Sequence, residues 1–505
     1  MHPFNILTTL TIYTVFATPL AKCCPVAPPD CVLEVETSSG VLNGFINASA
    51  PSVRQFLGVP FALPPTGTRR WQPPSKLESD KPINATNIGP ACPQQPLSAT
   101  PTLYVYAPSG GNRTEFFPLE NFSEDCLTLN VWTPEAPSKP LPVFVWYFGG
   151  GFVQGGTNSL YFNPQSWVQR TQQHIVVTVN FRSNIFGFPN ANGLTDQNLG
   201  LLDQRLALEW VRDNIANFGG DPLKIVTWGE SAGAIAADYL NFAYLEDPII
   251  SGIILESSTA LFPPKLCQSF DKAYANFSAV AIAFGCATAL SPVDCLKNVT
   301  WQDIQDSMVK LNLTSSFLPT ADERLVFSNY AQRYEIGAYS SAPAIIGSNQ
   351  HEANALIPPI LGVTLNETHA DEYTNATFLC TAAIASQLRE TTGRTTYRYR
   401  YDGNFPNISP PDFPGAYHAA ELPLIFGTAG DYHGASTTYE DSVSRSMQDM
   451  WLEFAKDPLN GLRNAGWCLY ADGKAVLIGG TEAPFQEIDI LQLDSVCNMS
   501  RLRIM

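Results

Sequence analysis

The sequence predicts an α/β fold in which a mostly parallel central sheet is covered by helices on both faces. Continuously apolar runs of β-prone residues alternate with stretches that have helical spacing. Unbroken apolar strands of this kind are typical of sheets buried on both faces. The composition, with 45% apolar and 15% charged residues, is that of a chain with a large core.

The alternation is clearest in the middle of the chain. The run Leu141–Tyr147 is apolar throughout and is soon followed by Gly149-Gly150-Gly151, as expected of a buried strand that enters a tight loop. His174–Val179 repeats the strand pattern. Leu201–Phe218 places its apolar residues on one helical face and ends at a Gly-Gly-Asp-Pro turn, after which Lys224–Trp228 predicts another strand.

The start of the chain predicts export. Residues 1–21 contain an apolar, threonine-rich run and resemble a signal peptide, although Lys and Arg are missing before the run, so an uncleaved anchor is the alternative. No later segment is apolar enough to cross a bilayer, and stable membrane insertion is not expected. Without repeats or long linkers, residues 22–505 are expected to form a single domain.

The charge of the chain excludes two classes of partner. The net charge is −17, and no run of Lys or Arg occurs anywhere. Nucleic acids and anionic lipid surfaces are bound through basic patches. We therefore expect neither as a partner.

Eleven cysteines accompany many Asn-x-Ser/Thr sequons, as in glycosylated proteins of an oxidising compartment. The cysteine spacing does not indicate a zinc site, and disulfides are the expected use. The candidate glycosylation sites are Asn47, Asn84, Asn112, Asn121, Asn276, Asn298, Asn312, Asn366, Asn375, Asn407 and Asn498.

A Gly-Glu-Ser-Ala-Gly motif at 229–233 is the strongest chemical signal. It directly follows a predicted strand and precedes the helix-prone run Ala234–Leu240, which is the context of the G-x-S-x-G elbow of α/β-hydrolases. A side chain at Gly229 or Gly233 would collide with backbone, while Ser231 would be strained with its hydroxyl presented. A chance Gly/Ser turn is the alternative, and the strand and helix on either side argue against it.

A serine hydroxyl needs a base to take its proton, and the chain has six histidines. His418 lies in Tyr417-His418-Ala419-Ala420-Glu421, downstream of the serine as the order of α/β-hydrolases requires. The other five have less support, because they lie in the signal, open a strand, fall between sequons or lack a motif: His2, His174, His369, His351 and His433.

Four segments together resemble the type-B carboxylesterase/lipase family, which includes cholinesterases and fungal lipases. They are residues 124–134 (EDCLTLNVWTP), the FGGGF run, residues 198–222 (NLGLLDQRLALEWVRDNIANFGGDP) and GESAG. The resemblance extends from about Gly40 to Gly480, and composition is most similar to the secreted fungal members. It implies an α/β-hydrolase that cleaves carboxylic esters through an acyl-enzyme.

The resemblance also implies a triad. Ser231 would be the nucleophile, His418 the base and Glu352 the acid, in the segment Gly347-Ser348-Asn349-Gln350-His351-Glu352-Ala353. The family usually has Glu-Gly here, and Ala353 departs from that pattern. Asp322 resembles a structural aspartate of the family instead.

The oxyanion hole of the family corresponds to the backbone N–H groups of Gly150, Gly151 and Ala232. Glycine suits this role, because amides aimed at one oxygen need an unusual backbone. No metal or organic cofactor has a part in such a mechanism, and none is expected. The implied partner is a small-molecule or lipid ester.

Supporting residues are implied as well. Glu230 and Ser257 would line or support the site, Ser257 through a hydrogen bond to the acid. Arg70 with Glu124, and Arg182 with Asp203, resemble the internal ion pairs of the family.

Two disulfides are implied by family positions: Cys92 with Cys126, and Cys286 with Cys295. Seven cysteines remain, and an odd number leaves at least one as a free thiol or bonded to another chain. They are Cys23, Cys24, Cys31, Cys267, Cys380, Cys468 and Cys497.

In the family, the loop closed by the first disulfide covers the site. Its aromatic residues fit an apolar lid that opens on lipid or an ordinary packed loop, and sequons at Asn112 and Asn121 indicate that part of it faces water. Cholinesterases place a tryptophan in this loop to bind quaternary ammonium, and residues 92–126 contain none, which argues against choline esters. The aromatic residues are Tyr104, Tyr106, Phe116, Phe117 and Phe122.

A non-catalytic adhesion or binding protein on the same fold is the rival interpretation. Such relatives typically lose the serine, so the intact set of Ser231, Glu352 and His418 favours an enzyme. Carboxylesterase and lipase, with the preferred acyl chain, remain open at this level.

Overall fold

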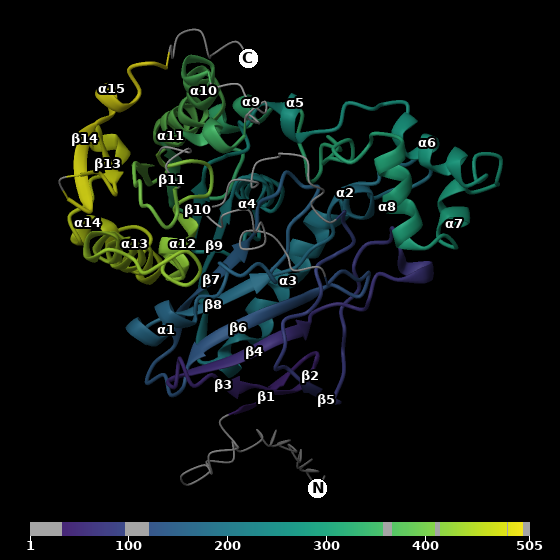
Figure 1. Ribbon diagram of the computed structural model, residues 1–505, viewed down its shortest axis with the longest axis horizontal. Coiled ribbons are helices and arrows are strands. Elements are labelled where there is room, and N and C mark those ends of the chain that lie inside the picture. The colour runs from purple at the N-terminus through teal and green to yellow at the C-terminus, as the bar shows by residue number, and fades with distance from the viewer. Residues whose placement is uncertain (1–32, 96–120, 357–365, 410–414, 482, 498–505) are drawn as a thin grey trace, which may run out of the picture.

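The computed structural model describes residues 33–95, 121–356, 366–409, 415–481 and 483–497, and its centre is a twisted sheet of eleven strands (Figure 1). In spatial order these are β14 (Phe485–Asp489), β13 (Lys474–Ile478), β12 (Thr396–Tyr401), β11 (Ala344–Asn349), β10 (Gly252–Glu256), β9 (Gly220–Glu230), β7 (Leu141–Tyr147), β8 (Ile175–Val179), β6 (Thr128–Pro134), β4 (Val53–Pro60) and β3 (Phe45–Ile46).

The sheet is parallel at its centre and antiparallel at its ends. From β13 to β8 every neighbouring pair is parallel, whereas β14, β6, β4 and β3 pair antiparallel. This confirms the predicted mostly parallel α/β architecture. A separate small sheet contains β1 (Glu34–Thr37), β2 (Gly40–Asn43) and β5 (Pro82–Asn84).

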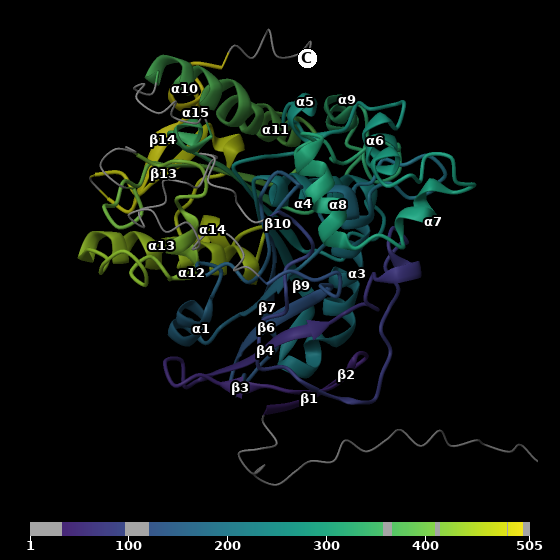
Figure 2. The same ribbon diagram turned by 45° about the vertical axis from the view of Figure 1, so that its right-hand side comes forward.

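Helices cover both faces of the sheet, as Figure 2 shows for α3 on one side and α12 with α13 on the other. Within the described ranges, no helix is long and apolar enough to cross a membrane. The helices are α1 (Gln165–Thr171), α2 (Asn184–Gly187), α3 (Leu199–Asn214), α4 (Ala232–Ala243), α5 (Pro264–Cys267), α6 (Ala275–Ala283), α7 (Pro292–Leu296), α8 (Trp301–Lys310), α9 (Tyr330–Glu335), α10 (Glu367–Thr374), α11 (Cys380–Thr391), α12 (Leu422–Phe426), α13 (Thr438–Lys456), α14 (Gly461–Asn464) and α15 (Ile490–Leu493).

The strand that leads to the serine begins earlier than predicted. β9 starts at Gly220, directly after Gly219 leaves the preceding 3-10 turn with φ 90°. Gly220 pairs with Leu141 of β7, and the register then shifts before the regular ladder begins at Val143. Because Pro222 has no N–H to donate, the residues that predicted a turn lie in this irregular part of the strand. The other end of β9, at Glu230, leads into the predicted elbow.

An aromatic cluster fixes α12 to the centre of the sheet. The rings of Trp146 on β7 and Trp228 on β9 have centroids 4.4 Å apart, and Phe426 of α12 stacks on Trp228 at 4.8 Å. All three side chains are fully buried. Large buried aromatic rings contribute strongly to core stability, so the segment before α12 is held at a defined place over the sheet.

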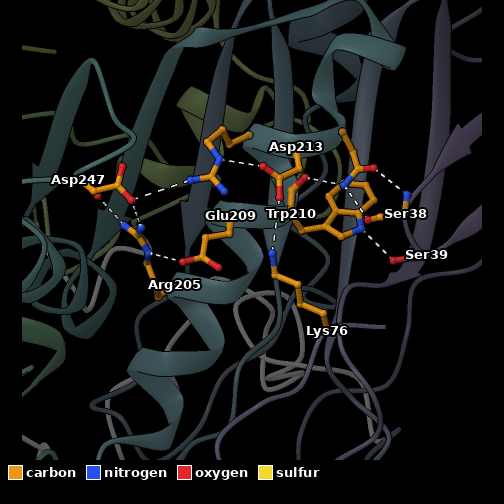
Figure 3. Close-up of polar contacts among 10 residues, drawn as sticks. Ser38, Ser39, Lys76, Arg205, Glu209, Trp210, Asp213 and Asp247 are labelled. Atoms are coloured by element: carbon orange, nitrogen blue, oxygen red, sulfur yellow. Dashed lines mark hydrogen bonds and ion pairs between the residues drawn. The ribbon is translucent and has the colours of Figure 1, made fainter. Parts of the chain in front are cut away.

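Polar contacts attach α3 to its surroundings on the other face (Figure 3). The indole N–H of Trp210 donates to the hydroxyl of Ser39 at 2.9 Å, next to the hairpin of β1 and β2. Arg205 bonds Glu209 at 2.8 Å and Asp247, beyond α4, at 2.6 Å. These contacts fix α3 between the amino-terminal hairpin and the segment after α4.

Both predicted disulfides are present. A third, between Cys380 and Cys497, joins α11 to the carboxyl-terminal segment. The described residues also contain two free thiols, Cys267, which is buried, and Cys468, which is partly exposed. Cys23, Cys24 and Cys31 lie outside the described residues. The two predicted pairs are Cys92–Cys126 and Cys286–Cys295.

His174 is a buried core residue that lies directly before β8, which begins one residue later than predicted. Its ring lies 4.3 Å from that of Trp167 and 5.6 Å from that of Phe144 between centroids, and Nδ1 is hydrogen-bonded to the hydroxyl of Thr171 at 2.9 Å. Burial, with smaller contributions from nearby cations, lowers the pKa of His174 to about 3. The folded protein therefore holds this imidazole neutral.

We predict that His174 contributes to loss of stability in acid. Because its folded pKa lies below the unfolded value of about 6.5, its contribution is complete above pH 6.5 and is lost as the pH falls toward 3. His174→Asn keeps a partner for Thr171 but cannot titrate. The free energy of unfolding of the wild type, relative to this variant, should fall by about 2 kcal/mol between pH 6.5 and 4.5. A difference between the two proteins that stays constant over this pH range would contradict a neutral, buried imidazole at position 174.

Candidate active site

Ser231 stands at a strained turn between β9 and α4. Its backbone has φ 54° and ψ −125°, and its side chain is partly exposed. A Cβ at Gly229 would lie 2.4 Å from the carbonyl carbon of Gly233, and one at Gly233 would lie 2.0 Å from the backbone oxygen of Tyr147 on β7. Both glycines are required by close backbone contact, as the motif predicted.

The predicted oxyanion amides lie beside this turn. A Cβ at Gly149 would lie 3.0 Å from the Cβ of Ser231, so the glycine loop after β7 directly borders the serine. Gly150 and Gly151 have φ of 100° and 64°. Among the described residues, no acceptor is bonded to the N–H groups of Gly150, Gly151 or Ala232. Amides without an internal acceptor are free to donate to a ligand.

Glu352 and His418 form a buried pair. Oε2 of Glu352 lies 2.6 Å from Nδ1 of His418, and both side chains are almost completely buried. Glu352 follows β11 on a strand-end turn, and His418 lies in the loop before α12. The other carboxylate oxygen, Oε1, accepts a hydrogen bond from the backbone N–H of Asn349 at 2.7 Å. The sequence did not mark Asn349 as a site residue, because an asparagine side chain is not an acid, a base or a nucleophile.

The second ring nitrogen of His418 contacts a different carboxylate. Nε2 lies 3.0 Å from Oε1 of Glu230, the residue before Ser231. No hydrogen bond joins His418 to Ser231 among the contacts of the described residues. The ring of Phe378 covers His418 with centroids 5.1 Å apart. The imidazole thus lies between two carboxylates and beside an aromatic wall that the sequence did not suggest.

The electrostatics of the site are dominated by burial and by this pairing. Burial by itself lowers the pKa of His418, but Glu230 and Glu352 together raise it to about 9. Burial raises the pKa of Glu230 to about 7 against the opposing effect of the imidazolium. Burial likewise raises the pKa of Glu256 and of Glu421, which lie near each other. The site holds several carboxyl groups that take up protons readily.

The structure separates the two acid candidates. Asp322 accepts hydrogen bonds from the backbone of Arg324 and Val326, each at 3.0 Å, and from the side chain of Asn198 at 3.0 Å. Within the described residues, Asp322 has no hydrogen bond or ion pair with His418. Asp322 therefore organises a turn, in line with the structural role inferred for it.

The expected hydrogen bond from Ser257 to the acid is wrong. Its Oγ is buried and has no hydrogen-bond partner among the described residues. Ser257 lies beside Ser231 because β9 and β10 are paired in register up to Glu230 and Glu256. The carboxylate of Glu352 instead accepts a hydrogen bond from the backbone N–H of Asn349, which residue type could not reveal.

Both predicted ion pairs are confirmed. Arg70 contacts Glu124 through two bonds of 2.5 and 2.6 Å, and Arg182 contacts Asp203 through bonds of 2.8 and 2.7 Å. Such bidentate pairs between largely buried groups fix the orientation of both side chains. They position the segments around the site and do not touch His418 or Ser231.

The predicted lid is described only at its base. Cys92 and Cys126 close it, and Phe122 lies in a short bridge with Ala91. Tyr104, Tyr106, Phe116 and Phe117 lie outside the described residues. In the part of the chain that the structure describes, no group of three or more His, Cys, Asp or Glu side chains is arranged so that it could hold a metal ion.

The arrangement can carry out nucleophilic acyl transfer. It offers a presented hydroxyl, an imidazole oriented by a carboxylate, and free backbone amides beside the hydroxyl. These are the parts that ester and amide cleavage by a serine requires.

Comparisons with known proteins agree with this chemistry. The sequence profile of the Carboxylesterase family matches residues 32–378 and 358–476. A chlorogenic acid esterase of Aspergillus niger is 42% identical over 438 residues, which cover 85% of this chain and 83% of that protein. Secreted lipase 5 of Gibberella zeae is 38% identical, covering 86% and 87%, and carboxylesterase 1D of Rattus norvegicus is 31% identical, covering 88% of each.

These matches extend over most of the chain and of its relatives, and they decide against the non-catalytic interpretation. The chain belongs to the carboxylesterase family and is a serine carboxylic ester hydrolase with an α/β-hydrolase fold.

Proposed function

We propose that Ser231, His418 and Glu352 are the catalytic triad with which this enzyme hydrolyses carboxylic esters. The observation that carries the proposal is the contact of 2.6 Å between Glu352 and His418, which come from loops 66 residues apart. The strained presentation of Ser231 and the free amides of Gly150, Gly151 and Ala232 support it.

In the reaction, the neutral imidazole of His418 turns its Nε2 from Glu230 to Ser231 and takes the hydroxyl proton. The serine oxygen attacks the ester carbonyl, and the oxyanion is bound by the three amides. His418 then protonates the departing alcohol. Water, activated by the same imidazole, hydrolyses the acyl-enzyme, while Glu352 orients the ring and stabilises the imidazolium.

The charge on Glu230 determines what fraction of His418 is in the neutral form, which is the form that can act as a base. Its ionised carboxylate stabilises the imidazolium, whereas its protonated form does not. The proton of the site is therefore distributed between His418 and Glu230, and only the neutral ring serves as a base. The pH dependence of the reaction follows from both groups.

We further propose that residues 22–505 act as one catalytic domain, that residues 1–21 direct secretion, and that the exported protein is glycosylated. The name of the Gibberella zeae relative supports secretion. Asn84, Asn121, Asn298, Asn312 and Asn366 are exposed, and Asn47, Asn276 and Asn375 are partly exposed. Asn112 and Asn498 lie outside the described residues.

We propose that Asn407 is the one described candidate that is not glycosylated. Its side chain is 6% exposed, and its Nδ2 donates to the backbone oxygen of Ala429 at 2.9 Å. A glycan on that nitrogen would break the bond and could not fit in the core, so we exclude Asn407.

For the substrate we propose a soluble aromatic ester such as chlorogenic acid. The Aspergillus niger relative of that name is 42% identical over most of both chains. The ring of Phe378 beside His418 provides an aromatic wall next to the reacting group, against which a planar acyl group can stack. Emulsified lipid esters are the competing class, because the relatives also include a lipase.

Ser231→Ala and His418→Ala should each lower the turnover of p-nitrophenyl acetate by about 10⁵- to 10⁶-fold, as in other serine triads. Both variants should remain folded, which circular dichroism and thermal unfolding would verify. Retention of more than about a hundredth of the activity would contradict the assignment.

Glu352→Gln tests the acid within the same series. It keeps the shape of the side chain but removes the charge that stabilises the imidazolium, so we expect a loss of about 10³- to 10⁴-fold. Asp322→Asn is the matched control and should mainly lower the melting temperature. Near-normal turnover by Glu352→Gln would exclude Glu352 as the acid.

Glu230→Gln should move the acid limb of kcat/KM to lower pH by about one unit or more. Removal of the neighbouring carboxylate lowers the pKa of His418, so the neutral base persists at lower pH. The control is Asp371→Asn, which removes a carboxylate beside His351 at 3.8 Å and should leave the profile unchanged. An unmoved acid limb in Glu230→Gln would show that this carboxylate does not set the protonation of the base.

The proposed substrate class predicts that kcat/KM for chlorogenic acid exceeds that for emulsified p-nitrophenyl palmitate by about tenfold or more. The two rates are measured with the same preparation, with and without the emulsion interface. A preference for the emulsified ester would identify a lipase and leave the triad assignment intact.

A further inference from the structure

Asn349 lies at the end of β11 and contacts both sides of the acid–histidine pair. Its side chain is 1% exposed. Its backbone N–H donates to Oε1 of Glu352 at 2.7 Å. Its side-chain Nδ2 donates to the backbone oxygen of Tyr417, the residue before His418, at 2.8 Å, and also to Oε2 of Glu421. One residue thus bonds the carboxylate through its main chain and the histidine loop through its side chain.

This double contact matters because the acid and the histidine come from separate loops. The contact of 2.6 Å between them is only as well defined as the relative position of those loops. A backbone bond from His351 to Ala416 at 2.9 Å also joins them. Within the residues described, Asn349 is the one whose side chain holds the histidine loop while its main chain holds the acid.

The chemistry of the position favours an amide. The side chain must donate two hydrogen bonds, one to a carbonyl oxygen and one to a buried carboxyl group. An aspartate of the same shape has no N–H to donate and would place a second carboxyl group beside Glu421. A buried acceptor left without its donor is unfavourable, so the loop would shift to find another partner.

We propose that Asn349 is a positioning residue, whose amide holds the loop of His418 against Glu352 so that the imidazole is aligned before substrate binds. The inference rests on the proposed triad. A displacement of about 1 Å in such a group lowers the rate by up to about 100-fold, because reacting atoms must meet within a narrow range of distance and angle. Binding of the ester does not depend on that alignment.

Asn349→Asp tests the role. We expect kcat to fall about 10- to 100-fold, with KM changed by less than about twofold, since alignment and not substrate affinity is lost. Rates are expressed per active site, counted by titration with a serine-reactive phosphonate, so that unfolded protein does not enter the comparison.

In the double variant Asn349→Asp/Glu421→Gln, the new amide at position 421 can donate to the new carboxylate at position 349. The hydrogen bond between the two side chains is thereby restored with donor and acceptor exchanged. The double variant should recover about tenfold of the lost kcat. Should the single variant fail to fold, a folded double variant within about tenfold of the wild-type kcat still supports the inference, and a slower one contradicts it.

Asn214→Asp is the matched control. Asn214 is a buried asparagine of α3 whose Nδ2 donates to Ser38 and to the backbone oxygen of Trp210, at 3.0 and 2.8 Å. It should lose thermal stability with kcat unchanged. The inference is overturned by an Asn349→Asp enzyme with kcat within about twofold of the wild type, by a loss that the double variant does not recover, or by an equal loss of kcat in Asn214→Asp.

The two assignments fail separately. If Glu352→Gln retains normal turnover, the triad itself is wrong and the inference falls with it. If Glu352→Gln is inactive while Asn349→Asp keeps its kcat, only the role of Asn349 is wrong.

Discussion

The strained turn at Ser231 is the constraint on which the rest of the site depends. A non-glycine residue at φ 54° costs about 1–3 kcal/mol and persists only where its surroundings leave no alternative. Here Gly233 packs against the backbone of Tyr147 on β7, and the N–H of Ser231 donates to the backbone oxygen of Glu256 on β10 at 2.9 Å. The serine is thereby attached to both strands that flank its own, and every other group must be brought to that fixed point.

Packing of α12 against the sheet positions His418 near Ser231. The loop that carries His418 leads into α12, and Phe426 of α12 stacks on Trp228, three residues before Ser231 on β9. Packing of these large rings therefore fixes the start of α12 relative to the strand that leads to Ser231. Glu352 arrives independently after β11, and hydrogen bonds from Asn349 to Tyr417 and from His351 to Ala416 join its loop to that of His418.

Burial gives the site its electrostatic character. A charged pair taken out of water is costly unless its geometry is good and its remaining lone pairs are bonded, and Glu352 meets both conditions through His418 and a backbone amide. Glu230, Glu256 and Glu421 are buried as well, and burial raises the pKa of each. Several of these carboxyl groups can therefore hold protons near neutral pH, which limits the negative charge that the low-dielectric interior must accommodate.

The sequence by itself determined the features that depend on neighbouring residues: the buried strand of β7, the helix of α3, the glycines around Ser231, and the order of serine, acid and histidine. It could not decide which atoms meet. Four features follow only from how distant strands and loops pack. They are the contact of Nε2 of His418 with Glu230, the free hydroxyl of Ser257, the disulfide Cys380–Cys497 and the link through Asn349. Periodicity and tight turns are local properties that a sequence displays, whereas contacts between loops 66 residues apart are set only when the sheet and its helices assemble.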